Sequence, residues 1–200
     1  MRRSWFILAI AALLLMQASA RAHLVTTGLG PVYDGVGHFC LSPDDSIPVA
    51  ALGLLAGLRG KRAARAVIFQ LPLAWFGGGT LALLAHVGAS PPLQCASFLA
   101  AGVLIAAAPP LPGQVVAAVA VAIGLLHGFL NGAAMRGASA GSGALALTGM
   151  AVTIFVLVTG AAALVVSIRV SWGRIVVRVA GSWIAAIGLL MLGWALRPGH

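Results

Sequence analysis

The chain consists of long apolar runs separated by short breaks that are rich in proline, glycine or charge. Each run is close to the length of about 20 residues that an α-helix needs to cross the hydrocarbon of a bilayer. Turn-forming residues mark breaks at 90–92, 109–113 and 136–143. We therefore expect about six membrane segments, over 36–58, 66–88, 93–108, 114–135, 144–168 and 176–196.

The first of these segments is interrupted. Ser42-Pro43-Asp44-Asp45 is typical of a helix start, with serine at the N-cap, proline at the first helical position and acids where the helix dipole is positive. We expect a new helix from Pro43 and a separate piece, helical or re-entrant, over 30–41. Irregular backbone at membrane depth is tolerated only where it is buried in protein or lines a wet cavity, so this break is itself a candidate site.

The amino terminus is typical of a secretory signal peptide. Two arginines precede an apolar run over 5–16, which is too short to span a bilayer, and small residues follow it. We predict removal of residues 1–22, with cleavage two residues earlier as the alternative, and a single transmembrane helical domain over 23–200. Removal of 1–22 would leave His23 with a free α-amine beside its imidazole, and such a pair can chelate a metal once both groups are deprotonated.

Composition and charge sharpen this interpretation. Of the residues, 61% are hydrophobic and 8% are charged, which excludes a water-soluble globule, because soluble domains average about 25% charged residues. The net charge of +9 does not indicate a nucleic-acid partner, since the basic residues form short clusters between apolar runs. With the mature amino terminus outside, the clusters within 59–65 and 169–178 fall inside and only Arg136 and Arg197 fall outside. We predict a multi-pass protein of the bacterial inner membrane with both termini in the periplasm.

Polar chemistry is sparse and gathers toward the outer side of this topology. The chain has only three acidic residues, which are Asp34, Asp44 and Asp45. Asp34 and His38 are four residues apart, and each would face the same side of one helix. The same spacing joins His127 and Asn131. Imidazole and carboxylate groups together suit divalent cations such as Ni²⁺, Co²⁺, Zn²⁺ and Cu²⁺.

We therefore predict a site for a divalent transition metal that is substrate or ligand and not a permanently bound cofactor. Its primary candidates are His23, Asp34, His38, His127 and Asn131. Secondary candidates are Asp44, Asp45, Cys40 and His86.

Structural roles remain as alternatives for these residues. His127 would then hydrogen-bond between helices, and Asp34 with His38 would form an interfacial pair. The remaining alternatives are helix capping for Asp44 and Asp45, an interfacial position for His86, a small buried side chain for Cys40, and a mere position beside the cleavage site for His23.

Several stretches resemble a known family of membrane proteins. Ala22-His23, the stretch Gly30–His38 with sequence GPVYDGVGH, and His127–Gly132 with sequence HGFLNG are similar to the HupE/UreJ proteins. The resemblance extends over nearly the whole mature chain in segment layout. It implies a helical membrane protein associated with hydrogenase and urease gene clusters, and some members of the family are nickel or cobalt permeases.

Two positions differ from the better-known members of that family. Those members have an aspartate directly followed by histidine in the first motif and a second histidine in the other. Here Asp34 and His38 are separated, and Asn131 stands in place of the second histidine. The chain is more similar to a divergent branch, and we expect a different metal affinity or metal choice, because asparagine is a poorer ligand for transition metals than histidine.

Three hypotheses about function follow. The first is a permease that takes up Ni²⁺ or Co²⁺, or else Cu²⁺ or Zn²⁺, from the periplasm. The second is a non-transporting membrane subunit that binds metal and delivers it to a metalloenzyme-maturation partner. The third is an intramembrane protease, since Ala140–Gly143 faintly resembles the rhomboid nucleophile motif; however, the only histidine after Ser142 is His200, and a loop explains the glycines better. We therefore expect that the protein is not an enzyme.

Overall fold

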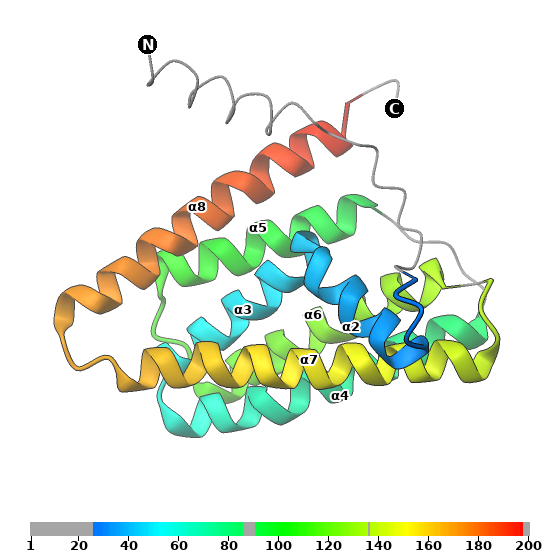
Figure 1. Ribbon diagram of the computed structural model, residues 1–200. Coiled ribbons are helices and arrows are strands. Elements are labelled where there is room, and N and C mark those ends of the chain that lie inside the picture. The colour runs from blue at the N-terminus through cyan, green and yellow to red at the C-terminus, as the bar shows by residue number, and fades with distance from the viewer. Residues whose placement is uncertain (1–25, 86–90, 136, 198–200) are drawn as a thin grey trace, which may run out of the picture.

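A computed structural model describes residues 26–85, 91–135 and 137–197. The described chain is helical, without a strand in those ranges, and the long helices form one bundle (Figure 1). Its elements are α2 (Pro31–Leu41), α3 (Pro43–Leu58), α4 (Lys61–Ala85), α5 (Pro91–Ala107), α6 (Gly113–Ala134), α7 (Ala140–Ser167) and α8 (Ser171–Ala195). The predicted signal peptide lies outside the described residues.

Candidate membrane spans follow from helix length and hydropathy. Among the described residues, four helices are long and apolar enough to cross a membrane, namely α4, α6, α7 and α8. The pair α2 and α3 passes the same test as a unit but is bent by 78°, and α5 is a shorter apolar helix. The structure therefore supports an all-α, multi-pass membrane protein with four or five candidate spans.

The predicted break in the first segment is confirmed. Helix α2 ends at Leu41, Ser42 has an extended backbone, and α3 begins with Pro43 at its first position. The hydroxyl of Ser42 does not cap α3. It donates instead to the backbone oxygen of His38 at 2.7 Å, so it ties the bend to the last turn of α2.

The loop predicted over 136–143 is wrong in its second half. Helix α7 already begins at Ala140, because the Ser139 hydroxyl oxygen accepts a hydrogen bond from the backbone N–H of Ser142 and caps the helix. The apolar pattern alone could not place this start, since glycine and serine in 140–143 weaken helix propensity.

Helix directions follow from the positions where backbones meet. Three glycines of α6 lie directly against α4, in the pairs Gly124 with Leu71, Gly128 with Trp75, and Gly132 with Gly79. The residue numbers of both helices increase in the same direction along these contacts, so α4 and α6 run parallel. Such close approach needs residues without a side chain, as in other tightly packed membrane helices.

The junctions α3–α4, α5–α6 and α7–α8 meet at one end of the bundle, on the left of Figure 1. Arg59 donates to the backbone oxygen of Ala108 at 2.9 Å, and Arg178 donates to that of Ala106 at 2.9 Å. We call this the basic end, because it gathers Arg59, Lys61, Arg62, Arg65, Arg169, Arg174 and Arg178. All three acids lie in α2 and at the start of α3, away from it.

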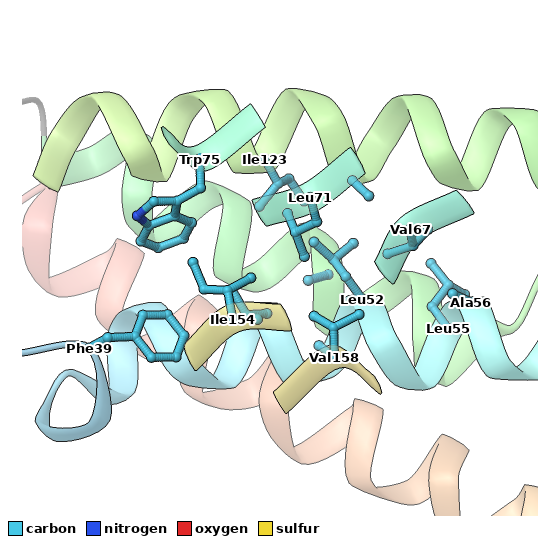
Figure 2. Packing of buried hydrophobic residues seen from close by; sticks show 14 of the residues in the cluster. Phe39, Leu52, Leu55, Ala56, Val67, Leu71, Trp75, Ile123, Ile154 and Val158 are labelled. Atoms are coloured by element: carbon cyan, nitrogen blue, oxygen red, sulfur yellow. The ribbon is translucent and has the colours of Figure 1, made fainter. Parts of the chain in front are cut away.

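A buried apolar cluster fills the space between α3, α4, α6 and α7 (Figure 2). Figure 2 shows Phe39 and Trp75 at one end of this cluster and Val67 with Leu55 at the other. The rings of Phe39 and Trp75 meet edge to face, with centroids 5.6 Å apart. Trp75 therefore forms the boundary between the apolar core and the polar residues described next.

Candidate functional site

The centre of the candidate site is a contact between His127 of α6 and Asp45 of α3. Nδ1 of the imidazole lies 2.7 Å from Oδ1 of the carboxylate, and the two side chains are 0% and 3% exposed. Asp45 stands in the first turn of α3, where the helix dipole favours a negative charge. Isolated charges at such burial are costly, so mutual pairing is what allows both groups to lie there.

Asn131 connects this pair to a second histidine. Its Nδ2 donates to Oδ2 of Asp45 at 2.8 Å and to the backbone oxygen of His127 at 3.0 Å. Its Oδ1 accepts a hydrogen bond from Nε2 of His38 at 3.1 Å. The amide therefore uses both N–H groups and its oxygen, which fixes its orientation and links α2, α3 and α6.

Ser97 brings α5 into the same set of contacts. Its Oγ donates to the backbone oxygen of Gln94 at 2.7 Å and lies 2.6 Å from Nε2 of His127. Each ring nitrogen of His127 therefore has a polar partner, with Asp45 at Nδ1 and Ser97 at Nε2. We call the set His38, Asp45, Ser97, His127 and Asn131 the central polar network.

Trp75 of α4 covers one face of the His127 ring. The two rings are stacked with centroids 5.6 Å apart and an angle of 29° between planes. The indole Nε1 is buried and has no hydrogen-bond acceptor among the described residues. Gly128, next to His127, permits this contact, because a Cβ there would overlap the backbone oxygen of Trp75.

The structure brings together only some of the predicted residues. His38, His127 and Asn131 meet in the central polar network together with Asp45, which sequence analysis had as a secondary candidate. Asp34 shares α2 with His38 but accepts its hydrogen bonds from the backbone and hydroxyl of Thr27, at 2.6 and 2.7 Å.

Asp44 and Cys40 are not members of the central polar network. Asp44 accepts a hydrogen bond from Nε2 of Gln94 at 2.7 Å, and Cys40 is exposed. His23 and His86 fall outside the described residues. Within the described part of the chain, no three His, Cys, Asp or Glu side chains form a group that could hold a metal ion by themselves.

Three contributors were missed by sequence analysis: Ser97, Gln94 and Trp75. A signal for the first two is present, because Gln94 and Ser97 are polar residues three apart in an otherwise apolar segment and so share a helix face. For Trp75 no pattern distinguishes a tryptophan that stacks on a buried histidine from one that packs in the core.

The arrangement offers two imidazoles, one carboxylate, one amide and one hydroxyl in a buried position between four helices. These groups come from the last turn of α2, the first turn of α3, the start of α5 and the second half of α6. The network thus lies in the half of the bundle opposite the basic end. Nitrogen and oxygen atoms of these types are among the ligands that divalent transition metals accept.

Comparison with known proteins identifies the family. Residues 11–191 match a family model described as HupE / UreJ protein. Because the match covers most of the chain, the protein belongs to the HupE/UreJ family. This is a membrane transporter-like family associated with nickel or cobalt transport or with the maturation of urease and hydrogenase. No curated protein and no solved structure matches the chain.

Proposed function

We propose that this HupE/UreJ protein is a permease for a divalent transition metal, with Ni²⁺ and Co²⁺ as the first substrates and Cu²⁺ and Zn²⁺ as the next. The observation that carries the proposal is the buried His127–Asp45 pair, which Asn131 connects to His38. Ionisable side chains inside membrane segments are costly and typically mark an ion or proton pathway.

The hydrogen bonding of the central polar network suits passage better than permanent binding. A metal ion that binds an imidazole must displace any proton on the ligating ring nitrogen, because that nitrogen coordinates only when it is unprotonated. The hydrogen bond between His127 and Asp45 and the hydrogen bonds of Asn131 therefore compete with the ion. Conduction requires binding that is strong enough for entry and weak enough for release, and this competition keeps affinity moderate.

Trp75 supports the same interpretation. Its ring face lies against His127, where the aromatic quadrupole favours a positive charge. Its buried Nε1 is a donor with no acceptor among the described residues. A water molecule carried by the entering cation would offer that acceptor.

We extend the proposal to the topology. The bent pair α2–α3 and the short α5 would each count as one crossing, which gives six. A cleaved signal peptide and the positive-inside rule would put the basic end in the cytoplasm of a bacterial inner membrane and both termini in the periplasm. A divalent ion that moves inward would then gain about 4.6 kcal/mol per 100 mV of membrane potential.

In this topology His23 and Asp34 would capture the ion before it reaches the central polar network. Asp34 is only partly buried and stands one helical turn before His38 on α2. Its hydrogen bonds with Thr27 would have to open for a metal to bind.

Metal accumulation in cells tests the proposal. Cell-associated Ni, Co, Cu, Zn, Mn and Fe would be measured by elemental mass spectrometry in cells that express the wild type or His38→Ala/His127→Ala at equal membrane levels. Cys40→Ala is the matched control, because Cys40 is exposed and lies two residues from His38. We expect one metal to rise with the wild type and the control only. Unchanged accumulation in the double variant would refute the proposal.

Metal delivery without transport is the second candidate, and the association of the family with urease and hydrogenase maturation favours it. The two functions differ in one property. A permease moves metal into liposomes without a partner, whereas a delivery subunit binds metal and moves none.

A further inference from the structure

A polar cavity lies at the basic end, in the half of the bundle opposite the central polar network. It has a volume of about 640 Å³ and lies between the first turns of α4 and α6. Its polar lining consists of Arg59, Arg62, Gln70 and Gln114, and its walls are small side chains such as Ala66 and Ala118. No acidic residue lines it. A cavity with this lining attracts an anion.

Arg59 is only partly satisfied at the edge of this cavity. One of its terminal nitrogens donates to the backbone oxygen of Ala108 at 2.9 Å. Its Nε is buried and has no partner among the described residues. Buried polar groups are nearly always hydrogen-bonded, so this unsatisfied N–H is available to donate to a bound ligand.

Two helix starts add to the positive potential. Helices α4 and α6 run parallel, and both begin at this end, where the helix dipole is positive. Neither has an acidic residue in its first turn, and α4 carries Lys61 and Arg62 there instead. Cations at a helix start are unfavourable unless an anion compensates them.

The position of Gln70 indicates the kind of anion. Gln70 stands nine residues after Lys61, roughly 13 Å along α4, and its side chain is exposed. The amide lines the cavity and makes no hydrogen bond to another described residue. An anion with polar groups below its phosphate would satisfy both Gln70 and the arginines. The cavity holds roughly twenty times the volume of a water molecule, which is enough for a lipid headgroup.

We propose that the cavity between α4 and α6 binds the phosphate of an anionic glycerophospholipid. The phosphate lies against Arg59 and Arg62 at the two helix starts, and the glycerol ester region reaches toward Gln70. Free phosphate shares the charge but has no group that reaches that amide. Basic cavities between membrane helices are known to take anionic headgroups. This site is independent of the metal route.

Native mass spectrometry of the purified full-length protein tests the site. The protein in detergent would be titrated with dioleoyl phosphatidylglycerol or dioleoyl phosphatidylcholine, and bound lipids would be counted. The test variant is Arg59→Gln/Arg62→Gln. The control is Arg65→Gln/Arg169→Gln, which removes the same charge from the basic end but not from the cavity lining.

We expect wild type and control to retain one phosphatidylglycerol and the test variant to bind it roughly 10- to 30-fold more weakly. Equal retention of phosphatidylcholine, or equal loss in test and control variants, would overturn the proposal. If the double variant is not monodisperse, the exposed Arg62→Gln alone serves as the test. Retention of the lipid in excess inorganic phosphate supports it as occupant, whereas its replacement by bound phosphate would overturn the lipid in favour of the free ion.

Discussion

Substitution of Gly128 tests the contact that positions the site. Gly128 lies against the backbone oxygen of Trp75, and a Cβ there would come closer than the 3.0 Å that real Cβ atoms keep from other atoms. The obstructing atom belongs to the backbone, so rotation of a side chain cannot relieve the overlap. Gly128→Ala must therefore push α6 away from α4 and lift His127 from the Trp75 ring, with which it is stacked.

Overpacking of this kind costs about 1–3 kcal/mol. Gly160→Ala is the matched control, because a Cβ on Gly160 in α7 meets nothing within 4 Å and alanine favours the helix by about 1 kcal/mol over glycine. In detergent we expect Gly128→Ala to unfold at a temperature roughly 2–10 °C below wild type, and Gly160→Ala at or above it. Equal melting temperatures for the two variants would refute the close packing of α4 and α6.

Three further outcomes are expected. Ser97→Ala leaves Nε2 of His127 without its hydrogen-bond partner, so the free energy of unfolding should fall by about 0.6–2 kcal/mol, and an unchanged unfolding curve would argue against the 2.6 Å contact. Asn131→His adds a better transition-metal ligand, so metal binding by isothermal calorimetry should tighten or change preference, and identical affinities would count against Asn131 as a ligand. A maleimide should label the exposed Cys40 of the folded protein much faster than the buried Cys95, whereas equal rates would contradict the burial of Cys95.

Much of the fold was accessible from sequence because its determinants are local. Apolar length predicted the long helices, and the Ser42-Pro43 pair predicted the break between α2 and α3. The spacing of His127 and Asn131 correctly predicted that they share a face, and the amide of Asn131 indeed reaches the backbone oxygen of His127.

The partners of the site residues could not be predicted, because they depend on contacts between helices far apart in sequence. The local sequence accounts for Asp45 as an acid in the first turn of α3. Its carboxylate nevertheless contacts the imidazole of His127, which is 82 residues away in the sequence. The hydrogen bonds of Asp34 were likewise not predictable from its neighbours on the helix. Its spacing from His38 predicted that both residues would contribute to one site. In the structure Asp34 instead accepts hydrogen bonds from Thr27, in the chain before α2.

Reconstituted transport measures the central claim most directly. Proteoliposomes with a metal-sensitive dye inside and an imposed negative internal potential would receive Ni²⁺ or Co²⁺ from outside. Wild type would be compared with Asp45→Asn and with Asp44→Asn, two neighbouring acids of which only Asp45 contacts His127 and Asn131. We expect uptake by wild type and Asp44→Asn and its loss in Asp45→Asn. Equal uptake by all three proteins would contradict the central polar network as the metal route.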